Sequence, residues 1–140
     1  MKKQKFNERI SEMVELVNKT YPKKYMENKY RTNLKFNLNQ KISRVMGHSL
    51  KGNKKRRKWE SLVNYNLNGL IKHLEKTMPE VYTWQDFLQG KLHIDHKIPI
   101  SAFNFTKPEH TDFKRCWALE NLRLLPAKEN LSKGKKFIYK

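Results

Sequence analysis

The stretch Leu92-His93-Ile94-Asp95-His96-Lys97-Ile98-Pro99 decides how the rest of the chain is interpreted. Its apolar residues frame a carboxylate that is followed directly by an imidazole. Pro99 cannot continue an ordinary central strand or helix, so a strand should end there. Alternation along that strand puts His93 on the same face as Asp95, where it could contact a metal or a phosphate, or could simply be packed.

Positive charge dominates the composition. The 140 residues include 31 Lys+Arg against 13 Asp+Glu, which gives a formal net charge of +18. Such a surface attracts polyanions, and solubility is better served by acidic residues, so the balance favours nucleic acid over a membrane or a merely solvated surface. The length suits one domain with a modest core, or a compact domain with a helical extension.

Location and cysteine chemistry are bounded by what the chain lacks. No apolar run approaches the roughly 18 residues of a spanning helix, and the segment after Met1 has no signal-peptide core. We therefore expect a cytoplasmic protein without membrane contact. The single cysteine, Cys116, excludes an intrachain disulfide and a zinc site built on a cysteine pair, and its neighbour Trp117 indicates a core thiol.

Two amphipathic helices are predicted before residue 50, and we expect their apolar faces to pack on the domain. The first should end near Tyr21-Pro22 and be followed by a basic connector over residues 22–31. The second should stop near Gly47. Their apolar stripes consist of Phe6, Ile10, Met13, Val14 and Val17, and of Leu34, Leu38, Ile42, Val45 and Met46.

Residues 51–58, Lys-Gly-Asn-Lys-Lys-Arg-Arg-Lys, form a dense basic run without an apolar residue. The run predicts a flexible, exposed loop or arm. Nuclear localisation and phosphate contact both remain open for it. Its candidate nucleic-acid contacts are Lys54, Lys55, Arg56 and Arg57.

The remaining pattern alternates short helices and strands. Asn66 can cap a helix that closes before Pro79, and His73 within it is expected to be packed or on the surface. A short helix over residues 112–117 should precede a strand over 121–126, antiparallel to the first strand if the two form a hairpin. A helix over 127–132 with Gly134 as its cap should then bring Asn130 opposite Asp95 and His96.

Three blocks of this chain closely resemble the motif blocks of HNH endonucleases. They read Ile-Asp-His-Lys-Ile-Pro (94–99), Cys-Trp-Ala-Leu-Glu-Asn-Leu-Arg-Leu-Leu (116–125) and Glu-Asn-Leu-Ser-Lys-Gly (129–134). The likeness is strongest to small free-standing phage and bacterial HNH proteins, and it covers residues 59–136. It implies an α+β fold with a ββα-metal core over residues 92–136. The implied organisation is a basic helical extension, 1–58, that contacts DNA, and a nuclease domain, 59–140.

The resemblance also implies roles for individual residues. His96 becomes the general base, and Asn121 the residue that pins the connecting loop through backbone hydrogen bonds. Asp95 and Asn130 become ligands of one divalent ion. The third letter of the HNH motif is often His in the family, and this chain has Asn130 there. The Asn variant is well represented in the family, so it leaves the expected activity unchanged and leaves the preferred metal open.

The chemistry of these residue types fits the implied roles. Hard oxygen donors favour Mg²⁺ or Mn²⁺ over zinc. A neutral His96 could accept a proton from water near neutral pH if a backbone carbonyl held its other ring nitrogen. Phosphodiester hydrolysis is the implied reaction. Further candidate phosphate contacts are Lys97, Arg123, Lys133 and Lys135.

The first hypothesis is therefore a metal-dependent endonuclease that nicks or cuts double-stranded DNA in a bacterial or phage-infected cell. The second is a basic nucleic-acid-binding protein on an HNH scaffold without cleavage, which explains the charge equally well. A ribosomal type of RNA-binding protein rests on charge alone and ranks third. One active site per chain makes a monomer a nickase and a homodimer a double-strand cutter, and the sequence does not choose between them.

Overall fold

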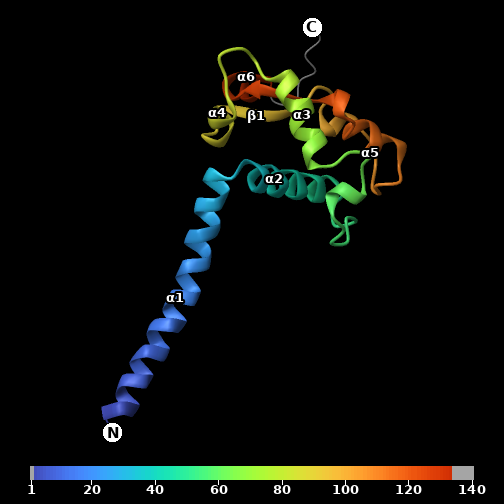
Figure 1. The fold of residues 1–140 in the computed structure, drawn as a ribbon. Helices are drawn as coiled ribbons and strands as arrows, with labels where there is room; N and C mark the ends of the chain where they lie inside the picture. Colours follow the sequence, from blue (N-terminus) through green and yellow to red (C-terminus); the bar gives the residue numbers. More distant parts are fainter. Residues whose placement is uncertain (1, 134–140) are drawn as a thin grey trace.

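The two strands in the described part of the chain pair as one antiparallel hairpin, and helices surround it (Figure 1). The structure is a computed structural model that describes residues 2–133, except the side chains of residues 17–22. The predicted cap Gly134 and the candidate contact Lys135 lie outside the described residues. The fold mixes helix and sheet, as expected for an α+β protein, and no helix in residues 2–133 could span a membrane. The elements are α1 (Lys2–Thr32), α2 (Leu34–Ser49), α3 (Leu67–Thr77), α4 (Trp84–Leu88), β1 (Leu92–His96), α5 (Thr111–Cys116), β2 (Leu122–Pro126) and α6 (Ala127–Lys133).

The hairpin has a defined register. Leu92 pairs with Pro126, Asp95 with Arg123 and His96 with Leu122. Two side chains of α3 fix this helix to β2, since His73 Nε2 donates to the Leu122 carbonyl at 2.8 Å and Thr77 Oγ1 accepts from Leu124 N at 3.0 Å. His73 is thus a packed residue, as predicted.

One hydrophobic core joins α2 to everything that follows it. Leu38, Ile42 and Met46 of α2 are 0 to 3% exposed and belong to the same cluster as Leu70 of α3 and Leu122 of β2. The predicted packing of the α2 stripe on the domain is confirmed, since α2 contacts α3 and α4. The extension predicted over residues 1–58 therefore shares the hydrophobic core of the domain at α2. Cys116 is fully buried in this core, as expected.

The first helix is longer and less packed than its sequence predicted. Helix α1 runs through Tyr21-Pro22 to Thr32 and projects from the domain (Figure 1). The predicted connector over 22–31 is therefore helical, since Lys, Glu, Met and Arg favour helix. Four residues of the predicted α1 stripe do not pack on the domain, and their exposed fractions are 63% for Phe6, 44% for Ile10, 65% for Met13 and 52% for Val14. The side chain of Val17, the fifth residue of that stripe, lies outside the described residues.

Residues 51–58 form a series of turns fixed to the rest of the protein, which corrects the expected flexible arm. Lys54 Nζ donates to Ser43 Oγ on α2 at 2.6 Å, and Asn53 Nδ2 donates to the Thr106 carbonyl at 2.7 Å. Lys55 and Arg56 adopt left-handed backbone angles, with φ of 53° and 59°. Internal hydrogen bonds therefore order this loop despite its charge.

Candidate functional site

A cavity of about 660 Å³ lies where β1, the loop after it, the end of α2 and α6 meet. Four of the residues chosen from the sequence line it, which are Asp95, His96, Asn130 and Lys133. His48, Ser49 and Lys51, at the end of α2 and the start of the basic loop, also line it. The sequence analysis did not find these three, because only the folded chain brings residues 48–51 beside β1.

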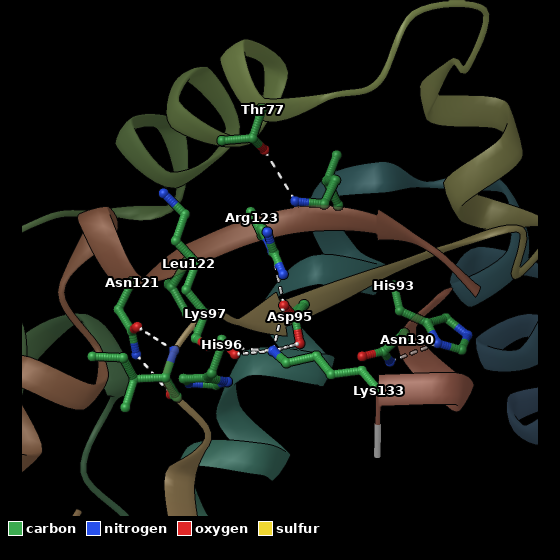
Figure 2. A network of polar contacts seen from close by, with 12 residues as sticks. Thr77, His93, Asp95, His96, Lys97, Asn121, Leu122, Arg123, Asn130 and Lys133 are labelled. Carbon is green, nitrogen blue, oxygen red and sulfur yellow. Dashed lines mark hydrogen bonds and ion pairs between the residues drawn. The ribbon is translucent and has the colours of Figure 1, made fainter. Parts of the chain in front are cut away.

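Asp95 is the electrostatic centre of the site. Its side chain is buried, and its carboxylate accepts hydrogen bonds from two cations (Figure 2). Lys133 Nζ lies 2.8 Å from both Oδ1 and Oδ2, and Arg123 Nε lies 2.9 Å from Oδ2. The hairpin register explains the second contact, since Arg123 is the cross-strand partner of Asp95. One negative charge is thus balanced by two positive charges.

His93 and Asn130 contact each other beside this ion pair. The Asn130 amide nitrogen donates to His93 Nδ1 at 3.0 Å. Figure 2 shows the amide oxygen of Asn130 on the side of Asp95. The predicted shared face of His93 and Asp95 is confirmed, because both side chains contact α6. His93 thus contacts Asn130. Neither the spacing nor the resemblance had indicated this contact.

His96 is held by packing. Its ring meets Trp117 edge to face, with centroids 4.5 Å apart and an interplanar angle of 87°. Its Nε2 atom is buried without a hydrogen-bond partner in the described part of the chain, and no backbone carbonyl there contacts either ring nitrogen, unlike the arrangement that we expected. Burial lowers the pKa of His96 to about 4, against the opposing effect of Asp95, so the ring is neutral at pH 7.

Asn121 fastens the loop that follows β1. Its side chain accepts from Ile98 N at 2.8 Å and donates to the carbonyls of Ile98 and Cys116 at 3.1 and 2.9 Å. Its own carbonyl accepts from Lys97 N at 2.8 Å. The predicted backbone hydrogen bonds to the connecting loop are therefore present, and Asn121 holds the chain directly after His96.

The donor set fits a cation. Carboxylate oxygens of Asp95 and the backbone carbonyls of His96 and Lys97 surround the Lys133 ammonium. Hard oxygen atoms of this kind are the ligands of Mg²⁺ and Mn²⁺, and the Asn130 amide oxygen would add another. Within residues 2–133 no three His, Cys, Asp or Glu side chains form a metal-binding group, so any ion would rely on the amide and on backbone oxygens.

The candidate nucleic-acid contacts divide into exposed and engaged residues. Lys55, Arg56 and Lys97 are exposed. Lys54 and Arg57 are half-buried and bonded within the protein, Arg57 to Glu109 among others. Arg123 and Lys133 are both bonded to Asp95, and Lys133 is only 2% exposed, so its ammonium does not reach the surface.

Comparison with known proteins adds one relative. No protein-family model matches the chain, and no solved structure matches it. The curated Uncharacterized protein L426 of Acanthamoeba polyphaga mimivirus is 31% identical over 114 residues, which cover 80% of this chain. The chain spans about half the length of that relative, 48%. The relative's name states no activity.

Proposed function

We propose that the protein is an HNH endonuclease with a ββα-metal core, which hydrolyses phosphodiester bonds of double-stranded DNA. One observation carries this proposal: His96, Asp95 and Asn130 line the same cavity. The first two lie on β1 and the third on α6, and the elements follow each other in the order strand, strand, helix that a ββα core requires. The three motif blocks, at residues 94–99, 116–125 and 129–134, supply these residues and Asn121. A protein that only binds nucleic acid has no use for a neutral histidine beside a carboxylate.

His96 is the general base of the proposed reaction. Its imidazole is neutral at pH 7, and its buried Nε2 has no hydrogen-bond partner among the described residues, so it can accept a proton from a water that attacks phosphorus once that water reaches Nε2. The Trp117 ring and the loop fastened by Asn121 hold the imidazole in place. This orientation by packing takes the place of the second-nitrogen hydrogen bond that many catalytic histidines have.

Asp95 and Asn130 would hold one divalent ion, Mg²⁺ or Mn²⁺. When bound, such an ion supplies stabilisation of the negative charge that develops on the phosphate and the leaving oxygen. By resemblance to the family the product carries a 5′ phosphate. The exposed cations Lys55, Arg56 and Lys97 attract the DNA backbone without reading its sequence.

A plasmid assay tests the proposal. Purified protein should convert supercoiled plasmid to nicked or linear DNA with Mg²⁺ or Mn²⁺, and EDTA should stop the conversion. His96→Ala should lower the rate by about 10²-fold or more while DNA binding survives. His110→Ala removes an exposed histidine outside the cavity and should cleave normally. Full activity of His96→Ala would remove His96 as the base, and no cleavage with any divalent ion would refute the proposal.

A second candidate is a basic DNA-binding protein on the same scaffold without cleavage. The observation in its favour is that two cations already neutralise Asp95. Such a protein would bind DNA with strong salt dependence and no response to EDTA. The plasmid assay separates the two candidates.

The number of subunits decides the product. A monomer would nick one strand, whereas a symmetric homodimer would cut both. For either subunit number we propose that the protein acts on DNA in the cytoplasm of a bacterial or phage-infected cell. Light scattering of the protein on a short duplex, together with sequencing of the ends produced, reports subunit number and strand count.

A further inference from the structure

Lys133 is a buried cation in a cage of oxygen atoms. It is 2% exposed, and it and Asp95 are the only charged residues in the described chain that are buried. Its Nζ atom lies 2.8 Å from each carboxylate oxygen of Asp95, 2.6 Å from the His96 carbonyl and 3.4 Å from the Lys97 carbonyl (Figure 2). An ammonium has three protons to donate, so four oxygens exceed its needs.

Four hard oxygens around one positive charge also describe a site for a divalent ion. The same Asp95 carboxylate cannot serve both partners equally. Arg123 already contributes one positive charge at Oδ2. A divalent ion added beside Arg123 and Lys133 would meet two like charges at short range, with a single carboxylate to balance them.

We propose that Lys133 is a tethered cation that occupies the cation position at Asp95 and competes with the divalent ion for it. The inference rests on the proposed function in so far as Asp95 is a metal ligand. In the metal-free protein Lys133 neutralises Asp95 and closes the site. A divalent ion binds when the ammonium withdraws, so the lysine sets the metal concentration at which the protein becomes active.

The position of Lys133 permits this exchange. It lies in the last turn of α6 and lines the cavity, whose volume of about 660 Å³ leaves room for the flexible four-carbon side chain. A displaced ammonium would face the cavity in which the DNA phosphate is proposed to lie. The alternative is a fixed ion pair that shapes Asp95 for the metal, and it predicts the opposite effect of removing the charge.

Manganese binding to the full-length protein, measured by electron paramagnetic resonance of free Mn²⁺, distinguishes the two. Lys133→Met keeps the length of the side chain and removes its charge, so it should bind Mn²⁺ about tenfold more tightly or better. Lys128→Met, an exposed lysine of the same helix, should not change the affinity. Adding Asp95→Asn to Lys133→Met should abolish the gain. Unchanged or weaker binding by folded Lys133→Met would overturn the proposal.

Acetylation of the unmodified protein gives a second measurement that does not depend on a variant folding. Lys133 should be protected from an amine-acetylating reagent without metal and should become several-fold more reactive when Mn²⁺ binds, whereas Lys128 reacts equally in both states. Protection of Lys133 that persists with Mn²⁺ bound would refute the exchange. Suppose that the unmodified protein cleaves DNA and that Lys133→Met binds Mn²⁺ with unchanged affinity. That result would refute this inference alone. Absence of cleavage with tighter Mn²⁺ binding by that variant would refute the endonuclease alone.

Discussion

His96 shows how packing can orient an imidazole and keep it neutral without a hydrogen bond. An edge-to-face aromatic contact and burial restrict the ring, and burial also removes water that would stabilise the protonated form. The result is an imidazole that stays neutral at pH values at which an exposed histidine is charged. Only the neutral form can accept a proton, and burial keeps this form populated at the cost of a weaker base, since a lowered pKa means a lower proton affinity.

The metal-free protein should show this in its titration. In EDTA, the ring signals of His96 in NMR spectra should titrate near pH 4, well below the ordinary value of about 6.5. Because the folded pKa is lowered, the unfolded chain binds a proton first as pH falls. The free energy of unfolding should therefore be highest above pH 6.5 and decrease from there down through pH 4.

A His96→Phe variant should remove that part of the pH dependence, and urea titrations at several pH values measure it. A His96 signal that titrates at 6.5 would contradict the burial of the ring.

Asn121 should contribute strongly to stability. Asn121→Ala leaves Ile98 N and the carbonyls of Ile98 and Cys116 without their partner. Buried groups left without a hydrogen bond cost about 1–3 kcal/mol each, so the loss of three should lower the free energy of unfolding by about 3 kcal/mol or more. Urea denaturation measures it, and Asn104→Ala, at an exposed position, should change the value by less than about 0.5 kcal/mol. A loss below about 1 kcal/mol for Asn121→Ala would show that water replaces these bonds.

At the scale of elements, the sequence pattern predicted those helices and strands whose signals lie within the element itself. The stripe over residues 34–46 predicted α2, Asn66 predicted the start of α3, and alternation with Pro99 predicted β1. The Asn66 side chain does accept the capping bond from Gly69 N, at 2.9 Å. The predicted helix after β2 is α6, which carries Asn130 beside His93.

Local helix propensity explains one of the errors, and tertiary contacts explain the other two. Pro22 predicted a helix end, but the residues after it are strong helix formers, and the helix continues to Thr32. The basic run predicted a flexible loop or arm, yet it is fixed at two points. Asn53 bonds to Thr106, which is distant in the sequence, and Lys54 bonds to Ser43 on α2. Lys133 is similar, because a lysine near the C-terminus of a helix usually faces water, and only the folded hairpin places Asp95 beside it.

Helix α2 should behave as part of the core. Met46 is fully buried and Val45, the next residue, is 37% exposed. Met46→Ala should therefore lower the free energy of unfolding by about 2–5 kcal/mol, whereas Val45→Ala should cost well under half of that. The two variants are compared by urea denaturation. Equal, small effects would mean that α2 is a separable extension, as the sequence first suggested.

At the scale of the whole molecule, the excess of positive charge acts through the exposed residues. A net charge of +18 cannot be balanced internally, since only a few of the cations pair with carboxylates in the described residues. Lys55, Arg56 and Lys97 are exposed, and the loop that carries the first two has fixed backbone geometry. An ordered basic loop loses less conformational entropy on contact with phosphate than a flexible arm would.

Replacing Lys55, Arg56 and Lys97 together by glutamine should weaken DNA binding uniformly across sequences. Each lost phosphate contact lowers the slope of log affinity against log salt by about 0.9, so the slope should fall by nearly 3. Fluorescence anisotropy with duplexes of unrelated sequence measures both quantities. Lys72→Gln with Lys76→Gln, exposed on α3, is the control, and an equal loss in the control would show that binding follows total charge alone.

The ion pair between Asp95 and Lys133 joins residues 38 positions apart in the chain. Such a contact closes a long loop, and the entropy of that closure has to be overcome before the contact can stabilise anything. During folding, the oxygen cage therefore forms only after the hairpin has closed and α6 has docked. Whatever chemistry this cavity performs therefore belongs to the completed fold, and an unfolded chain, in which these residues are scattered, lacks it.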